Sequence, residues 1–422
     1  MESGSNTTIT DPKLAEFGDD FFKGATVWVN AGSRWTSQTS EVTDHSGDTI
    51  TFNGLGLTDV QNTPAKGNPY YLFNVYGALD SENEWWYDEE EQMLYLYGDP
   101  TGKTVQVKAR DTAINLDNVS YVNIDGIQVL GAGISGTNTS SITLNRVEAN
   151  YAAHASTIEN PYGTDVASIK LFGNNNTISN CEVAYSSATG VWISGDDNLL
   201  FNSKIHDTDY IGSYGACINV SGSGNVVSHN TAYNTGRDII IFQSGDNCKI
   251  EYNDFSHSGM ICADLGVFYT VATDGGGTEI CYNWVHDNDS SGSRSGIYLD
   301  NGTSNWLVHH NVVWDAGTAL QLNVPSNYIA AYNNTFIGNI NQDFAWVFKT
   351  DTWGDRIINN IATGNIALKD ETLARTNFGN IADPGFENAD EHQYSCWQTR
   401  RPSTLRKLFL ASTTTMWELH LI

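Results

Sequence analysis

The sequence predicts an all-β chain whose central part is a parallel β-helix, a solenoid of short stacked strands. A segment with an aliphatic residue three positions before Asn recurs from Arg110 onward, at intervals of 22 to 30 residues. Such a variable period, without a helical phase, is typical of coils made of two or three short strands. Abundant Asn, Gly, Ser and Thr and scarce Pro and Met favour strands and tight turns over helices. Equivalent positions in successive coils are Cys181, Ser203, Asn230, Asn253, Asn283, Asn311, Asn334 and Asn360.

The repeated asparagines are expected to belong to the scaffold. In stacked coils, an Asn side chain can bond to the Asn above and below it and satisfy backbone groups at the bend. We therefore interpret these asparagines as structural and not as catalytic residues.

Changes in composition and in the coil repeat along the sequence predict four segments. Residues 1–20 are a polar lead-in, and residues 21–108 contain short strands separated by turn residues, which predict an N-terminal β subdomain. The parallel β-helix, of about ten coils, is predicted over residues 109–366. Residues 367–422 lose the coil pattern and are interpreted as a C-terminal cap or an irregular tail. Since an open solenoid end exposes core and unpaired strand edges, we expect the N-terminal subdomain to cap the coils.

Charge restricts the partners. The chain has 21 Lys and Arg against 49 Asp and Glu, a net charge of −28, which opposes binding to nucleic acid or anionic membranes. The sequence contains no run of 18 apolar residues, so no membrane span is predicted. The first 20 residues lack the apolar core of a signal peptide. The Lys-poor, Asn- and Thr-rich composition nevertheless favours a secreted, extracellular or periplasmic protein. A polysaccharide or oligosaccharide is the expected partner.

The cysteines and histidines show no spacing typical of a metal site. Six cysteines lack a CxxC pair, and neither HExxH nor three-His spacing occurs, so no metal site is predicted. Most thiols are expected to be small buried hydrophobes, while a Cys248–Cys281 disulfide stays open as an alternative. Residues 287–292 resemble the start of an EF-hand loop, but Tyr298 stands where a bidentate Glu is required. No cofactor is expected to be required, and a structural calcium ion is the one candidate.

Two strands of the repeat carry outward polar and aromatic side chains. The segments GVWIS at 190–194 and GIYLD at 296–300 share one phase, so their aliphatic residues point inward. Trp192, Tyr298 and Asp300 then point outward on one sheet. A carboxylate beside aromatic rings suits general acid, base or nucleophilic work on a sugar. The alternative is a solvated Asp300 that helps the DNG turn.

Further carboxylates precede neighbouring strands. Asp264 stands ahead of GVFYT, which places Tyr269 outward one coil before Tyr298, and Asp238 has a comparable place in GRDIIIF. Two carboxylates from adjacent coils can serve as the acid and the base or nucleophile of a glycosidase. Asp264, Asp300 and Asp238 are therefore the predicted catalytic residues.

The same edge contains candidate substrate-binding residues. Arg237 and Arg294 could orient the carboxylates or bind sugar hydroxyls, although a structural ion pair explains them equally well. His257 lies in the longest interval of the repeat and is the best functional histidine, since the others recur at turns. The predicted binding residues are Trp192, Arg237, His257, Tyr269, Tyr298 and Arg294.

The segments GRDIIIF, CKIEYNDFSH, ADLGVFYT, TEICYNWVHD, SGIYLDN and LVHHNVVWD together are similar to a known family. They resemble right-handed parallel β-helix carbohydrate-active enzymes: β-helix glycoside hydrolases with xylosidase and fucosidase members, and related polysaccharide lyases. The resemblance implies a glycan-cleaving groove, in which Asp300 matches the Asp of a "YLD" segment and Asp264 the Asp ahead of "GIYT". The chain departs from the family pattern at ADLGVFYT and at DNG.

Three functions are compatible with these patterns. Hydrolysis of glycosidic bonds by paired carboxylates is the first expectation. A polysaccharide lyase or uronate epimerase is the alternative, for which Arg237, His257 and Tyr269 would supply base and charge neutralisation; the low basic count disfavours it. The third is a non-catalytic glycan-binding solenoid.

Overall fold

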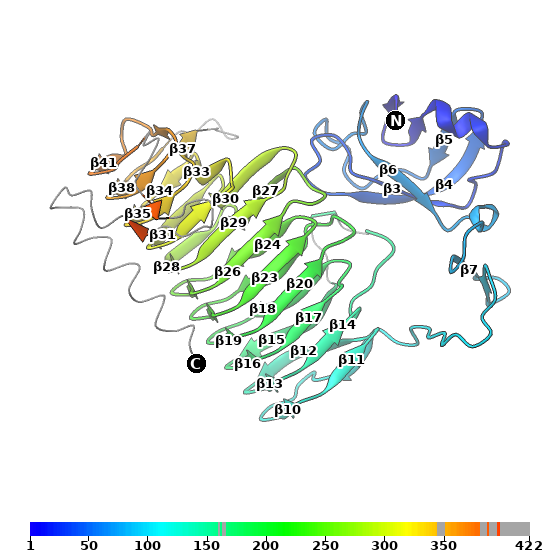
Figure 1. The fold of residues 1–422 in the computed structure, drawn as a ribbon, viewed down its shortest axis with the longest axis horizontal. Coiled ribbons are helices and arrows are strands. Elements are labelled where there is room, and N and C mark those ends of the chain that lie inside the picture. The colour runs from blue at the N-terminus through cyan, green and yellow to red at the C-terminus, as the bar shows by residue number, and fades with distance from the viewer. Residues whose placement is uncertain (159–160, 163–165, 344–350, 380–385, 388–394, 397–422) are drawn as a thin grey trace.

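The computed structural model describes residues 1–158, 161–162, 166–343, 351–379, 386–387 and 395–396. Figure 1 shows a solenoid of stacked coils with a separate N-terminal antiparallel sheet at its side. The all-β parallel β-helix predicted from the repeat is confirmed. None of the described helices is long and apolar enough to cross a membrane.

The N-terminal part is a six-stranded antiparallel sheet with its own apolar core, which includes Ile9, Val27 and Ile50. Its strand order is β1-β2-β5-β4-β3-β6. A separate antiparallel hairpin follows it. The elements are β1 (Ser3–Gly4), β2 (Thr8–Thr10), 3-10 helix η1 (Pro12–Glu16), β3 (Thr26–Val29), β4 (Gln38–Ser46), β5 (Thr49–Phe52), β6 (Tyr70–Phe73), 3-10 helix η2 (Tyr76–Ala78), β7 (Trp85–Asp88) and β8 (Met93–Leu96).

Three parallel sheets form the solenoid, and each coil gives one strand to each sheet in turn. The first sheet contains β9 (Thr112–Asn115), β12 (Gly133–Ser140), β15 (Ala167–Asn174), β18 (Thr189–Ser194), β21 (Ala216–Ser221), β24 (Asp238–Ser244), β27 (Asp264–Thr270), β30 (Ser293–Leu299), β33 (Thr318–Asn323), β37 (Asn339–Asp343) and β40 (Ile366–Ala367). The second sheet contains β10 (Asn123–Asp125), β13 (Thr143–Asn145), β16 (Thr177–Ser179), β19 (Leu199–Phe201), β22 (Val226–Ser228), β25 (Lys249–Glu251), β28 (Asp274–Cys281), β31 (Thr303–His309), β34 (Ser326–Asn327), β35 (Ala330–Tyr332), β38 (Arg356–Ile358) and β41 (Leu373–Arg375). The third sheet contains β11 (Gln128–Leu130), β14 (Glu148–Asn150), β17 (Glu182–Ala184), β20 (Lys204–Thr208), β23 (Thr231–Thr235), β26 (Asp254–Ser258), β29 (Trp284–Asn288), β32 (Val312–Trp314), β36 (Thr335–Phe336) and β39 (Ile361–Ala362). Two short strands, β42 (Phe386–Glu387) and β43 (Ser395–Cys396), pair with each other.

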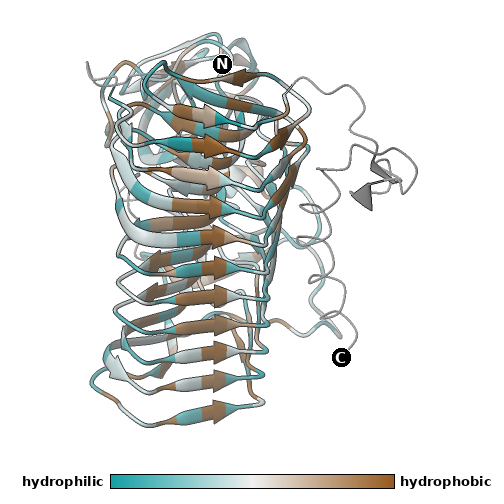
Figure 2. Cartoon of the chain, turned by 90° about the vertical axis from the view of Figure 1, so that its left-hand side faces the viewer, coloured by the Kyte–Doolittle hydropathy of each residue, from teal (hydrophilic) through white to brown (hydrophobic). Residues whose placement is uncertain are grey.

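Every second residue of these strands points into the solenoid. In the first sheet, one register row of buried apolar residues runs through successive coils, as the period-two alternation predicts. Figure 2 shows hydrophobic segments recurring at matching places in the stacked strands. The row consists of Val191, Ile218, Ile240, Phe268, Ile297 and Leu320. Burial of this row drives the coils together.

The repeated asparagines form a buried hydrogen-bond ladder, so their predicted structural role is confirmed. Asn283 is representative: its Oδ1 accepts from the backbone N of Asn253 at 3.0 Å. Its Nδ2 donates to the carbonyl of Ile250 at 2.8 Å and to Oδ1 of Asn311 at 3.0 Å. The same pattern repeats in neighbouring coils and pairs polar groups that would otherwise be buried without partners.

The N-terminal sheet does not cap an end of the solenoid, contrary to the expectation from exposed edges. It docks on the side of the middle coils (Figure 1), where the indole of Trp28 donates to the carbonyl of Ile211 at 2.7 Å. Arg34 donates to the carbonyl of Ile261 at 2.6 Å. These contacts involve turns that precede strands of the first sheet, so the subdomain covers part of that sheet's outer face.

Five cysteines whose side chains the structure describes are free and buried: Cys181, Cys217, Cys248, Cys262 and Cys281. Their role as small buried residues is confirmed, and the alternative of a Cys248–Cys281 disulfide is wrong.

Removing one rung of the ladder should destabilise the solenoid. In Asn283→Ala the buried backbone N of Asn253 loses its acceptor and the carbonyl of Ile250 loses a donor. Each orphaned buried group costs about 1–3 kcal/mol, so we expect a loss of roughly 2–4 kcal/mol in denaturant unfolding. The matched control is Gln128→Ala, which removes an exposed amide; its effect should stay within about 0.5 kcal/mol. Equal denaturant midpoints of unfolding for the two variants would contradict a stabilising role of the asparagine ladder.

Candidate functional site

The predicted aromatic residues lie in one row on the outer face of the first sheet. Trp192 pairs in register with Asn219. The row then continues from coil to coil through Ile241, Tyr269 and Tyr298. Because neighbouring strands are about 4.8 Å apart, this row runs along the solenoid axis. Tyr269 and Tyr298 are adjacent in it, and Trp192 lies three coils from Tyr269.

Asp300 follows the last residue of β30 and is held by three donors. Its Oδ2 accepts from the hydroxyl of Tyr269 at 2.9 Å. Its Oδ1 accepts from Nδ2 of Asn323 at 2.7 Å and from the backbone N of Asn301 at 2.7 Å. The residue is 8% exposed. A carboxylate oriented by donors alone is suited to act as a base or a nucleophile.

Asp264, the first residue of β27, has a different environment. In the described part of the chain, no group donates a hydrogen bond to its carboxylate, whereas its backbone carbonyl accepts from Nη2 of Arg237 at 2.9 Å. Burial raises the pKa of Asp264 to about 6, against the attraction of the Arg237 guanidinium, and the charge of Asp300 raises it further. A carboxyl group with this pKa is partly protonated near neutral pH and can donate a proton.

The two carboxylates are electrostatically coupled. Asp300 contributes to the raised pKa of Asp264, and both carboxylates contribute, after burial, to the raised pKa of Tyr298. Both carboxylates are largely removed from water, but Asp300 accepts three hydrogen bonds, whereas no group in the described part of the chain donates to Asp264. When two titratable groups have such contrasting environments, one can act as the acid and the other as the base.

Arg237 and Asp238 form a buried ion pair behind these carboxylates. Arg237 is 1% exposed and Asp238 is fully buried. Nη1 of Arg237 pairs with Asp238, and its Nε donates to the carbonyl of Trp35 at 3.1 Å. Asp238 also accepts from the backbone N of Gly266 at 3.0 Å. Almost no surface of the pair is exposed, so in this structure neither side chain is open to a substrate, whereas both were predicted to act on one directly.

The tyrosines are likewise covered. Tyr269 and Tyr298 are 3% and 5% exposed, and their rings meet edge to face with centroids 5.2 Å apart. The guanidinium of Arg237 lies over Tyr269 at 4.7 Å and over Tyr214 at 3.9 Å. A ring on which a sugar stacks must have one face open to solvent. Because these two rings are covered, they do not form the stacking surface expected from the sequence. Their hydroxyls instead orient Asp300, directly from Tyr269 and through Asn323 from Tyr298.

Trp192 lies apart from this cluster on the same face. It is half-buried, packs edge to face against Phe172 with centroids 5.2 Å apart, and has the ammonium of Lys170 5.3 Å from its ring centroid. It can contact only a ligand that extends several coils along the solenoid.

His257 and Arg294 are not brought to the carboxylates by any described contact. His257 lies on β26 of the third sheet, and its imidazole lies between Asp289, at 2.9 Å, and Asp287, at 3.8 Å. Arg294 is exposed, and its Nε donates to the carbonyl of Asn288 at 2.8 Å. The two acidic residues of the EF-hand-like segment thus have an imidazole as their partner.

Three contributors to the site escaped the sequence analysis: Asn323, Tyr214 and Trp35. Asn323 was detectable, because the register of Leu299 with Leu322 places Asn323 beside Asp300 in the next coil. Tyr214 and Trp35 come from loops outside the repeat, so no periodic signal marks them.

The comparisons agree with this architecture. Residues 167–336 match the family model described as a right handed beta helix region. The matched residues lie within the solenoid, and its three parallel sheets agree with a right-handed parallel β-helix fold. No curated protein matches the sequence.

Several solved structures are similar to the chain. One, titled "Glycoside hydrolase", is 12% identical with a TM-score of 0.50, over 94% of this chain and 76% of that one. The A-module of a mannuronan C-5 epimerase from Azotobacter vinelandii is 14% identical with a TM-score of 0.37, over 60% and 65%. The catalytic unit of an alpha-1,3-glucanase from Streptomyces thermodiastaticus is 12% identical with a TM-score of 0.33, over 90% and 87%. At these identities the likeness concerns the fold alone.

The raised pKa of Asp264 should be measurable as a pH dependence of stability. The carboxyl has a folded pKa of about 6, above the unfolded value of about 3.9, so the native state binds its proton more tightly. Its contribution is fully present below about pH 4 and is lost as the pH rises to about 6, by roughly 3 kcal/mol. Denaturant unfolding of the wild type and Asp264→Asn at pH 4 and pH 7 isolates this loss, because the amide does not titrate. Parallel pH dependences would show that Asp264 titrates normally.

Proposed function

We propose that the chain hydrolyses glycosidic bonds in a polysaccharide or oligosaccharide, using Asp264 as the proton donor and Asp300 as the base or nucleophile. The observation that carries the proposal is the contrast between the two carboxylates: Asp264 has a raised pKa and no hydrogen-bond donor among the described residues, whereas Asp300 accepts three hydrogen bonds. This is the combination that glycoside hydrolysis needs at one bond. The shared fold with a structure titled "Glycoside hydrolase" supports it.

Each carboxyl group has a defined task in this reaction. Asp264 transfers its proton to the oxygen that leaves as the bond to the anomeric carbon breaks. Asp300 either attacks that carbon or removes a proton from an attacking water molecule. Tyr269 and Asn323 hold Asp300 in place, so that little reorganisation is needed when charge develops.

The outer face of the first sheet offers polar groups for a chain-like substrate. Tyr298 is followed in register by Gln321 and then Asn341, both half-exposed. The amide of Gln321 donates to Asp343 at 2.8 Å. On the other side, the row reaches Trp192. Side chains repeated in successive coils can bind successive sugar units along the axis.

The alternative lyase or epimerase reaction needs a cation to neutralise the uronate carboxylate. Arg237 is the cation nearest the site, but it is buried and engaged with Asp238, Asp264 and Trp35. His257, the suggested base, is occupied by Asp289. These contacts favour hydrolysis over either uronate reaction.

Activity should depend on both carboxylates. With a panel of neutral and acidic glycans, Asp264→Asn and Asp300→Asn should each lower the release of reducing ends by about 10²–10⁴-fold, the usual contribution of a positioned acid or base. Asp274→Asn, in the second sheet, is the matched control and should retain wild-type rates, with circular dichroism confirming the fold of each variant.

Other outcomes decide between the rival functions. New reducing ends accompanied by an unsaturated-sugar chromophore would establish a lyase, because hydrolysis yields reducing ends without that chromophore. Glycan binding without any product would leave a binding solenoid. Full activity in both carboxylate variants would remove Asp264 and Asp300 from the mechanism.

A further inference from the structure

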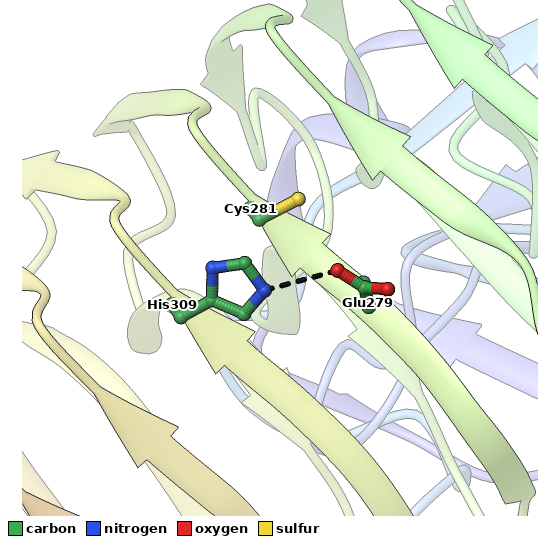
Figure 3. Close-up of side chains that lie close together, drawn as sticks. All are labelled: Glu279, Cys281 and His309. Carbon is green, nitrogen blue, oxygen red and sulfur yellow. Dashed lines mark hydrogen bonds and ion pairs between the residues drawn. The ribbon is translucent and has the colours of Figure 1, made fainter. Parts of the chain in front are cut away.

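Three potential metal ligands of different chemistry meet on the outer face of the second sheet. Glu279 and Cys281 lie on β28 and His309 lies on β31, and one donor atom from each is within 4.8 Å of the others. Figure 3 shows the carboxylate, thiol and imidazole gathered between the two strands. Nε2 of His309 is 3.1 Å from Oε2 of Glu279. A thiol, an imidazole and a carboxylate are the donors that zinc takes in proteins.

A fourth donor comes from the preceding coil. Glu251 on β25 is the register partner of Cys281, which is in turn the partner of His309. Oε2 of Glu251 is 3.9 Å from Sγ of Cys281. Three adjacent coils therefore present ligands at one position, and a small movement of flexible Glu side chains would bring four donors to the roughly 2.0–2.3 Å of zinc–ligand bonds.

Burial and charge in this cluster favour a cation. Cys281 is 1% exposed and His309 is 7% exposed, while the carboxylates of Glu251 and Glu279 converge on them. The facing lysine is Lys249, whose side chain is half-exposed and whose ammonium is 3.9 Å from Glu279. One ammonium offsets two carboxylates only in part, so a divalent ion would compensate charge that these described groups leave unbalanced.

The imidazole is also oriented by its surroundings. Nδ1 of His309 is 2.9 Å from Nδ1 of His310, whose Nε2 is 3.3 Å from the amide of Asn333. Tyr332 stacks on the His309 ring with centroids 4.9 Å apart. A second hydrogen bond and a packed ring fix the orientation of metal-binding histidines generally.

We propose that Cys281, His309 and Glu279, with Glu251 as the fourth ligand, bind one Zn²⁺ ion that joins three coils of the second sheet. On binding, the Cys281 thiol releases its proton to solvent and the sulfur forms the bond to zinc. Four protein ligands leave no position for substrate, so the ion has a structural role. The site is independent of the carboxylates on the first sheet.

Cobalt titration tests the proposal on the full chain. After chelator treatment, one equivalent of Co²⁺ should produce a thiolate-to-cobalt charge-transfer band, and added Zn²⁺ should remove it by competition. Cys281→Ser should abolish the band, and His309→Gln should weaken zinc binding by more than about tenfold, since even supporting partners of a ligand contribute that much. The matched control is Cys248→Ser, which removes another buried thiol, one bonded to the carbonyl of Gly222.

Zinc should also raise the thermal unfolding temperature of the wild type and Cys248→Ser. In His309→Gln, which keeps every thiol, this stabilisation should be smaller. No cobalt band in the wild type, or a band that persists in a folded Cys281→Ser, would overturn the proposal. If Cys281→Ser does not fold, His309→Gln decides: unchanged zinc affinity would overturn the site.

Discussion

The structure depends on the register between coils that the buried asparagine ladder maintains. From Asn253 to Asn360, each ladder asparagine offers its Oδ1 to the backbone N and the Nδ2 of the asparagine one coil earlier, as Asn283 does for Asn253. Its own Nδ2 reaches a backbone carbonyl of that earlier coil. A slip of one residue would leave several buried polar groups unpaired, at about 1–3 kcal/mol each. Register is therefore fixed more strongly than apolar packing alone would fix it, because aliphatic rows tolerate exchange of similar residues.

Fixed register turns positions in a repeat into neighbours in space. Along the first sheet it places Tyr269 beside Tyr298, and the end of that strand gives Asp300 its partner Asn323. Along the second sheet the same constraint aligns Cys281 with His309. Two chemically different clusters thus arise from one rule, and the loops and side chains of each coil determine what each cluster does.

The sequence predicts those features that depend on the repeat and its register, but not those that depend on loops outside the repeat. The repeat predicted the β-helix, and the phase of its strands placed Asp300 on the same face as Tyr269, which donates to it. It could not show that the tyrosines are covered, because the covering groups include Tyr214, from a loop outside the repeat, and Arg237, which bonds to Trp35, 202 residues away. The cluster around Cys281 was missed because metal motifs were sought at short spacing. Cys281 and His309 each precede a ladder asparagine by two residues, so the coil alignment contained the signal.

The docking of the N-terminal sheet explains why the first-sheet site has unusual electrostatics. An isolated solenoid would leave Asp264 and the tyrosines on an outer face in water, where a carboxyl keeps its ordinary pKa. The loop that carries Trp35 meets Arg237, which also bonds the carbonyl of Asp264 and pairs with Asp238. A buried ion pair contributes little net stability, but it is costly to break, since either partner alone would be an uncompensated charge. Arg237 therefore links the docked loop to the coil that contains Asp264, and burial is the main cause of the raised pKa of that carboxyl. In the reaction proposed for this site, the N-terminal sheet thus supports the proposed proton donor through Arg237, although none of its residues needs to touch the substrate.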